Sequence, residues 1–302
     1  MLEIGDNMIR SDNEWSRLKR VILGSAENFN FPKNDPEYST WDEAPIGPAS
    51  PIAIHETQEA LNLFQAELEK LGVEVIRPKP IDHVKEDGFG CYCPRDTTLV
   101  IGDKVILTPT VWPNRRIEWK AIRAALGDNV TTVDDPAAVF DAANIIRCGK
   151  DILYLISYSG NEAGADWLEN YLGPEYIVHR LNAVYQGMHL DSTIVPLRDG
   201  LVMLNSERIK EYQLPDFMKS WDKIWIKQED LIQPKGWDHM TSNWIGMNVL
   251  SYDENTIFCD SNQTILRKKF DKYGIETIGV NLPHAKMFMG GHHCVTLDLQ
   301  RL

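Results

Sequence analysis

Short stretches rich in Val, Ile, Thr, Tyr and Leu recur along the whole chain, each bounded by Gly, Pro, Asp or Asn. This pattern predicts many brief β-strands rather than a few long ones. The predicted strands are residues 20–23, 73–77, 98–101, 105–108, 152–157, 176–179, 201–204, 223–226, 248–252, 256–259, 276–280 and 294–299. Turn sequences such as Gly102-Asp103, Asp199-Gly200 and residues 253–255 predict hairpins between neighbouring strands.

Helices are predicted where apolar residues recur every three or four positions. The clearest stripe runs from Leu61 to Leu71 and lies opposite Gln65 and Glu69, as in a helix with one buried face. A second stripe covers residues 266–273, and shorter helices are predicted for residues 118–126 and 162–172.

Three predicted helices end in Leu or Tyr followed by Gly72, Gly173 or Gly274, and an apolar run follows each. Glycine suits the left-handed residue that closes many helices. Hairpins also precede helix-like stretches near residues 206–212 and 261–272. The repeated hairpin–helix–strand unit predicts a radial, pseudo-symmetric α/β fold rather than a doubly wound sheet. A generic α+β fold with coincidental Gly caps is the alternative.

Nothing in the composition divides the chain, because no linker rich in Pro, Gly or Ser occurs. Residues 1–302 are therefore predicted to form a single domain. Residues 29–51 carry five prolines and few apolar repeats, which predicts an ordered surface loop near the N-terminus.

The charge balance limits the classes of partner. The 302-residue chain has 31 Lys and Arg against 44 Asp and Glu, a formal net charge of −13. Nucleic acid or an anionic membrane would need a basic patch, so neither is an expected partner. No apolar run approaches the roughly 18 residues of a membrane-spanning helix, and residues 1–6 lack the pattern of a secretion signal. Five scattered cysteines without a CxxC pair make a disulfide framework or structural zinc a weak interpretation. We expect a cytoplasmic protein.

The segment Gly290-Gly291-His292-His293-Cys294 is the candidate for chemistry nearest the C-terminus. We predict that Cys294 begins a strand and that the two glycines let the backbone approach a ligand closely. Alternatively, Cys294 is a small buried hydrophobic residue, and the histidines are surface residues or metal ligands. No further soft metal ligand stands at a suitable spacing, and the motifs GxGxxG after a strand, GxxxxGK[ST] and HExxH do not occur.

Further candidates are one histidine and three acids. His189 and Asp191 alternate as on a strand, so their side chains are predicted to point the same way. Such a pair opposite a remote Cys suits covalent thiolate chemistry. Asp141 and Asp96 each stand at the edge of an apolar stretch. Taken singly, His189 could be structural and either of these two acids a turn or helix cap.

Taken together and in order, these segments resemble the amidinotransferase family of the pentein superfamily, and within it the arginine:glycine amidinotransferases. The resemblance covers nearly the whole chain. It rests on residues 13–15, 20–24, 94–96, 140–143, 188–191, 205–208, 240–250 and 290–294. It implies a pentein-type α/β propeller of five ββαβ-like modules around a pseudo-fivefold axis, which agrees with the repeated unit.

The resemblance also implies a reaction: the amidino group of L-arginine moves to an acceptor amine through a covalent intermediate on a cysteine, and ornithine leaves. Cys294 would attack the guanidinium carbon, while His189 would protonate the departing amine and later deprotonate the incoming one. Asp141 would accompany His189, and Asp96 would bind guanidinium nitrogens. A substrate cation beside Cys294 would favour thiolate over thiol.

Substrate-binding residues are implied in the same way. Those that would grip the amino-acid part of the donor are Asp191, Arg208, Thr241 and Ser242, with Arg208 on the carboxylate. Met188 and Gln186 would line the acceptor pocket. Relatives that use glycine carry Met before the His, so glycine is the expected acceptor and guanidinoacetate the expected product. No metal or cofactor is implied. The expected partners are small molecules, with a homodimer as a candidate assembly.

Some positions depart from the family pattern. Gln186 stands where glycine-specific members usually have Asn, Asn144 replaces an acid, and His292 replaces an aromatic residue. The segment between residues 126 and 140 is much shorter than in typical members, which could alter access to the site or the choice of acceptor. Three alternatives follow: an amidinotransferase with another acceptor amine, an arginine deiminase on the same fold, and a binding module without activity. The last class typically lacks the Cys–His–acid set.

Overall fold

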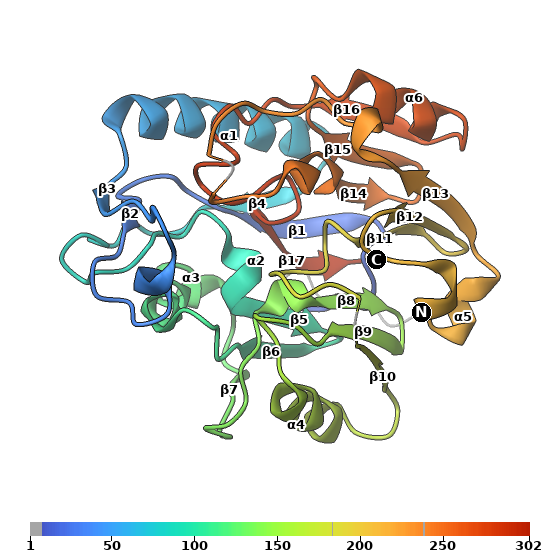
Figure 1. Ribbon diagram of the computed structural model, residues 1–302, viewed down its shortest axis with the longest axis horizontal. Helices are drawn as coiled ribbons and strands as arrows, with labels where there is room; N and C mark the ends of the chain where they lie inside the picture. Colours follow the sequence, from blue (N-terminus) through green and yellow to red (C-terminus); the bar gives the residue numbers. More distant parts are fainter. Residues whose placement is uncertain (1–7, 183, 238) are drawn as a thin grey trace.

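Five three-stranded sheets form the frame of the described part of the chain, which comprises residues 8–182, 184–237 and 239–302 of a computed structural model. Figure 1 shows the sheets grouped around the middle of the molecule, with α1, α4 and α6 at its periphery. Each sheet consists of an antiparallel pair extended by a parallel strand, and a helical segment connects the two parallel strands. The predicted ββαβ unit and the radial α/β architecture are therefore confirmed.

The first sheet joins the two ends of the chain, because β17 (Thr296–Arg301) pairs with β1 (Leu18–Leu23), which pairs with β4 (Glu74–Ile76). The second contains β5 (Thr98–Ile101), β6 (Lys104–Leu107) and β7 (Val130–Thr132). The third contains β8 (Ile145–Cys148), β9 (Asp151–Leu155) and β10 (Ile177–Leu181). The fourth contains β11 (Ile194–Arg198), β12 (Leu201–Asn205) and β13 (Asp222–Ile226). The fifth contains β14 (Leu250–Asp253), β15 (Thr256–Cys259) and β16 (Glu276–Gly279).

Four of the five connecting helices overlap stretches that the periodicity predicts as helical, and the short helix at residues 216–219 was not predicted. The five helices are α1 (Pro51–Lys70), α3 (Trp119–Ile122), α4 (Glu162–Leu172), α5 (Asp216–Lys219) and α6 (Thr264–Asp271). Leu61, Phe64 and Leu68 of α1 are fully buried. The predicted helix-closing glycines Gly72, Gly173 and Gly274 all have φ between 70° and 78°, the left-handed region that favours glycine.

Two segments expected on strands lie in turns instead. Residues 188–191 form a turn ahead of β11, and β17 begins at Thr296, so Cys294 precedes the strand. An alternation of three residues is too short to separate a strand from a turn. Residues 206–212 are likewise a turn followed by a short 3-10 helix, η5 (Glu211–Gln213), rather than a longer helix.

The strands β7, β8 and β11 were not predicted. Pro196 lies in β11, and a proline normally argues against a central strand because it cannot donate a hydrogen bond. In this sheet β11 is the edge strand, where a missing donor is tolerated.

Residues 29–51 are more than a surface loop. They contain the short pair β2 (Asn30–Phe31) and β3 (Gly47–Pro48), and the side chains of Phe29, Phe31 and Tyr38 are buried. Tyr38 packs edge-on against Trp112, so the loop is part of the largest core cluster.

Residues 1–7, on which the expectation about a secretion signal partly rests, lie outside the described residues. Across the described ranges, no helix has the length and hydrophobicity needed to cross a membrane.

Candidate active site

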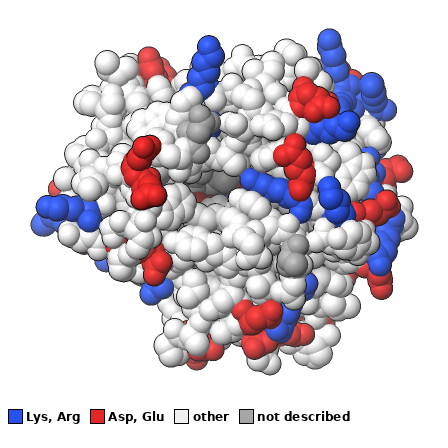
Figure 2. All heavy atoms as spheres, in the orientation of Figure 1, with Lys and Arg blue, Asp and Glu red and all other residues white. Residues whose placement is uncertain are grey.

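A cavity of about 500 Å³ brings together most of the residues predicted from the sequence. The predicted residues on its wall are Asp96, Gln186, Met188, His189, Asp191, Thr241, Ser242 and Cys294. Figure 2 shows the molecule hollowed near the centre of the face drawn there. A concave site with a few convergent polar groups is the usual form of a small-molecule site.

Cys294 is held at the cavity by Asn248. The Asn248 side-chain oxygen accepts hydrogen bonds from the amide nitrogens of His293 and Cys294, both at 3.0 Å. Its Nδ2 donates to the Cys294 Sγ at 3.2 Å. One amide group thus fixes the main chain and the sulfur of Cys294 together.

Gly290 is needed for the packing behind the sulfur. A β-carbon at this position would lie within 3 Å of both the Cys93 Sγ and the Cys294 Cβ. The Cys93 and Cys294 thiols also share a hydrogen bond. The lack of a side chain at Gly290 thus makes room for protein side chains, among them a second thiol, and the predicted close approach to a ligand stays a prediction.

The resting state of Cys294 is a thiol. The hydrogen bond with Cys93 and burial raise its pKa well above the ordinary value, and the nearby Asp191 carboxylate adds to the effect. The thiol donates to Asp191 Oδ2 at 3.3 Å. A negative charge on the sulfur thus needs a cation nearby to become stable.

His189 adopts an unusual backbone conformation, with φ of 66°. Its amide nitrogen donates to Asn144 Oδ1 at 3.2 Å, and the next amide, of Leu190, donates to the carbonyl of Ala143 at 2.8 Å. Left-handed backbone at a non-glycine residue costs energy and persists where the surroundings impose it. Asn144, which departs from the family pattern, thus helps to place the His189 ring.

Two carboxylates flank the His189 ring. Nε2 lies 2.9 Å from Asp141 Oδ2, and Nδ1 lies 3.8 Å from Asp96 Oδ1. Burial alone would lower the pKa of His189, but Asp96 and the hydrogen bond with Asp141 outweigh it and raise the pKa well above its ordinary value. The ring is therefore positively charged at neutral pH, as a general acid must be before it gives up its proton.

One oxygen of Asp96 has no hydrogen-bond partner among the described residues. It lies at the end of the cavity where His189 and Cys294 meet, which we call the reacting end. Asp96 Oδ2 accepts from Arg115 Nη1 at 2.7 Å, whereas Oδ1 is buried and has no hydrogen-bond partner among the described residues. Burial raises the pKa of Asp96, against the opposing effects of His189 and Arg115. A buried acceptor without a donor is costly, so Oδ1 is suited to a ligand that brings an N–H group.

Asp191 also lies at the thiol, although the sequence-based expectation placed it with the amino-acid part of the donor. Thr241 and Ser242 lie on another part of the wall, whereas Arg208, also expected at the donor, contacts Ser242 and is not among the described residues that line the cavity. Arg208 donates to Ser242 Oγ at 3.0 Å, and its guanidinium stands 3.9 Å from the centre of the Tyr185 ring. Thr241 Oγ1 donates to the carbonyl of Lys286 at 2.9 Å.

Aromatic residues make up a further part of the wall. Trp41, Trp112 and Tyr158 all line the cavity, with the Trp41 ring centre 5.0 Å from that of Trp112 and 6.4 Å from that of Tyr158. Met188 lines the same cavity and packs against the main core cluster. The cavity thus offers flat apolar surface as well as hydrogen-bonding groups.

Donor atoms of Asp96, His189 and Cys294 lie within 4.8 Å of one another, a spacing that also suits a metal ion. The resemblance implies a role without a metal for each of these groups, and we assign none of them as a metal ligand.

Some residues of the site were missed or left without a role by sequence reasoning. Arg115 carries no sequence signal, and only the fold shows that it fixes Asp96. Cys93, Asn248 and His293 lie inside the segments on which the family resemblance rests or next to them, so their proximity to the site could have been suspected. Asp141 is buried behind His189 and does not line the cavity among the described residues.

Comparison with curated proteins finds relatives along nearly the whole chain. Inosamine-phosphate amidinotransferase 1 of Streptomyces griseus is 36% identical over 338 aligned residues, covering 98% of this chain and 97% of the relative. The mitochondrial glycine amidinotransferase of Xenopus tropicalis is 31% identical over 354 residues, covering 96% of this chain and 82% of the relative. No family model matches the chain.

Comparison with solved structures also finds amidinotransferases along nearly the whole chain. The inosamine-phosphate amidinotransferase of Streptomyces griseus superposes with a TM-score of 0.89 at 36% identity, covering 98% of this chain and 97% of that one. An amidinotransferase of the saxitoxin biosynthetic pathway of Microseira wollei has a TM-score of 0.88 at 31% identity, covering 97% of each chain. The dimethylarginine dimethylaminohydrolase of Pseudomonas aeruginosa, at 16% identity and a TM-score of 0.69, covers 93% of this chain and 99% of its own and shares the fold.

Proposed function

This chain belongs to the amidinotransferase family of the pentein superfamily, and on that premise we propose that it moves the amidino group of L-arginine to a primary amine through Cys294. Amidino transfer itself follows from the family. The donor, the acceptor and the role of each residue are the proposal.

The observation that carries the donor assignment is the pair of carboxylates beside the thiol. Asp96 Oδ1 is buried without a partner among the described residues, and Asp191 Oδ2 lies 3.3 Å from the Cys294 sulfur. A guanidinium between them would give N–H donors to both carboxylates, with its carbon next to the sulfur. Ser242, farther along the wall, and Arg208, which donates to it, would receive the α-carboxylate of arginine.

In the first half-reaction the bound cation lowers the pKa of the Cys294 thiol, the thiol proton leaves to solvent, and the thiolate attacks the guanidinium carbon. His189 donates a proton to Nε of the substrate, the bond between carbon and Nε breaks, and ornithine leaves as a neutral amine. The amidino group stays on the sulfur, and His189 is left neutral.

The second half-reaction runs the same steps in reverse with a new amine. The acceptor enters as a neutral amine, the form in which ornithine left, and attacks the amidino carbon while neutral His189 takes the proton that the attacking nitrogen loses. The bond between carbon and sulfur breaks, which restores the Cys294 thiolate beside a protonated His189. The proton that His189 donates in the first half-reaction is thus returned to His189 in the second.

We propose an acceptor other than glycine. The relatives at 36% identity are inosamine-phosphate amidinotransferases, and those near 31% are glycine amidinotransferases. The expectation of glycine is therefore unconfirmed. Because ornithine leaves before the acceptor enters, the space that held arginine is open to the second substrate. The aromatic wall of Trp41, Trp112 and Tyr158 suits an amine with a ring or an alkyl part.

Glycine is the second candidate, and one observation favours it. Met188 lines the cavity next to His189, where its side chain takes up space beside the incoming amine. An arginine deiminase is less well supported, since the curated relatives at 36% and 31% identity are transferases and the hydrolase likeness concerns the fold alone.

A single-turnover experiment tests the proposal. The protein is mixed with L-arginine alone and quenched in acid, and we expect one equivalent of ornithine and an amidino adduct on the Cys294 peptide. An adduct only on Cys91, Cys93, Cys148 or Cys259 would overturn the nucleophile assignment, and citrulline with ammonia would indicate a deiminase.

The amidinated enzyme is then offered glycine, an alkylamine, an aminocyclitol and its phosphate in parallel. We expect faster transfer to at least one of the larger amines than to glycine. Transfer to glycine alone would contradict the acceptor assignment and leave the donor chemistry standing.

A further inference from the structure

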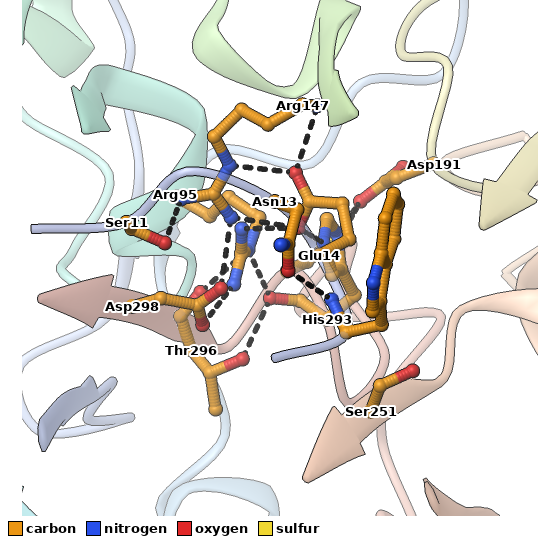
Figure 3. A network of polar contacts seen from close by, with 12 residues as sticks. Ser11, Asn13, Glu14, Arg95, Arg147, Asp191, Ser251, His293, Thr296 and Asp298 are labelled. Atoms are coloured by element: carbon orange, nitrogen blue, oxygen red, sulfur yellow. Dashed lines mark hydrogen bonds and ion pairs between the residues drawn. The ribbon is translucent and has the colours of Figure 1, made fainter. Parts of the chain in front are cut away.

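A line of buried polar contacts leads from the thiol into the core, as Figure 3 shows in part. Asp191 Oδ2, which accepts from the Cys294 thiol, lies 2.8 Å from His293 Nδ1. The other ring nitrogen of His293, Nε2, lies 3.2 Å from Glu14 Oε2. Arg147 holds the Glu14 carboxylate through Nε at 2.7 Å and Nη2 at 2.6 Å.

The orientation of the His293 ring is fixed from several sides. Its amide nitrogen donates to Asn248 Oδ1, and its carbonyl oxygen accepts from Arg95 Nε at 2.8 Å. Carboxylate oxygens face both ring nitrogens. A neutral imidazole has a single N–H, so both contacts become donated hydrogen bonds only when both nitrogens carry a proton.

We propose that His293 and Glu14 are positioning residues that hold the Asp191 carboxylate at the Cys294 thiol, where it receives the cationic group of the donor. The proposal rests on the function proposed above. Among the described residues, neither His293 nor Glu14 lines the cavity, so both would act through Asp191.

The charges around Asp191, His293 and Glu14 agree with this role. Burial would raise the pKa of Asp191, but the hydrogen bond from His293, together with His189 and Cys294, lowers it to about 2. Asp191 therefore stays ionised beside the sulfur across the working range of pH.

Beyond Glu14, the charged groups are Arg95, Arg147 and Arg301, which share the Asp298 carboxylate. These ion pairs are nearly fully buried, and breaking one would leave an unpaired charge. They support Glu14 rigidly, at the end of the Asp191–His293–Glu14 contacts that is remote from the cavity.

A matched pair of variants separates the two ring nitrogens. In His293→Asn the amide can place an N–H near the position of Nδ1, facing Asp191. In His293→Gln the longer side chain reaches the position of Nε2, facing Glu14. We expect His293→Asn to keep the KM for arginine within about threefold of wild type and His293→Gln to raise it by roughly tenfold or more, the range for lost support of a binding group.

The pH profile adds a readout that a purely structural role would not move. Without the Nδ1 donor, Asp191 takes up a proton more readily, so the acid limb of kcat/KM shifts to higher pH in His293→Gln and less in His293→Asn. Glu14→Gln, which leaves the His293–Asp191 contact in place, is the second variant and is expected between the two. If all variants lose kcat/KM in parallel, in proportion to the fall in their melting temperatures, the proposal is overturned.

Alkylation of Cys294 tests the carboxylate without turnover. We expect wild type to react faster with a cationic haloacetamidine than with neutral iodoacetamide, and His293→Gln to lose most of that preference. The same preference in wild type and His293→Gln would overturn the positioning role alone. A wild type that shows the preference but forms no amidino adduct with arginine would contradict the proposed function alone.

Discussion

His189 Nε2 lies 2.9 Å from Asp141 Oδ2, and this contact decides which ring nitrogen is left for chemistry. The Asp141 carboxylate is fully buried, and its other oxygen accepts from the amide nitrogen of Val111 at 3.1 Å, so it cannot turn away. Nδ1 is the nitrogen that faces Asp96 and the reacting end of the cavity. The buried acid thus sets the orientation of the ring and, together with Asp96, favours its charged form.

Asp141→Asn should move the alkaline limb of ornithine release to lower pH. Asp141 is one of the groups that raise the pKa of His189, so its removal lowers that pKa and the ring loses its proton at a lower pH. At pH 8 we expect the single-turnover rate with arginine to fall by roughly 10²- to 10⁴-fold, the usual contribution of a general acid. An unchanged alkaline limb would show that His189 is not the acid.

Cys93→Ala should make Cys294 more reactive. The hydrogen bond with Cys93 is the largest cause of the raised pKa of Cys294, so its loss lowers that pKa and increases the thiolate fraction at a given pH. The rate of Cys294 alkylation by iodoacetamide, followed by mass spectrometry from pH 7 to 9, measures this. Cys91→Ala is the matched control, because Cys91 is equally buried but belongs to a different core cluster. Equal alkylation in both variants would contradict the argument.

Arg208→Gln should weaken the binding of arginine and leave agmatine, which lacks the carboxylate, unaffected. The present hydrogen bonds of Arg208 go to the hydroxyls of Ser192, Thr193 and Ser242, so its charge is available to a carboxylate. A hydrogen bond to a charged group contributes about 1.5–3 kcal/mol, and we expect the KM for arginine to rise by roughly tenfold to a hundredfold. Wild type should already use agmatine as poorly as the variant uses arginine. An equal loss on both donors would place Arg208 elsewhere in the mechanism.

Met188→Ala should change the choice of acceptor more than the release of ornithine. The shorter side chain opens space beside His189, and a change of one or more methylene groups in such a pocket shifts discrimination by roughly 10- to 200-fold. The measurement is the ratio of kcat/KM for an aminocyclitol to that for glycine, with Met188→Leu as a control of similar volume. A ratio unchanged from wild type would remove Met188 as a determinant of the acceptor.

The repeated module could be read from the amino-acid order alone, and the candidate reacting groups could be proposed from it. Glycines such as Gly72 and Gly274 end helices because they alone adopt positive φ without strain, and such local rules apply to a single chain. The order of Asp96, Asp141, His189 and Cys294 within their motifs carried the resemblance to the family. These features depend on neighbours in the chain or on residue type, so no coordinates are needed to see them.

How those groups face one another depends on the complete fold. His189 sits on left-handed backbone held by Asn144, whereas the short alternation in the sequence had suggested a strand. Asp191 proved to lie at the thiol, and Arg115 and Glu14, far away in the chain, support the two carboxylates there. The reason is physical: buried charges are stable only with partners, and those partners come from whichever modules meet at the centre, which no local pattern records.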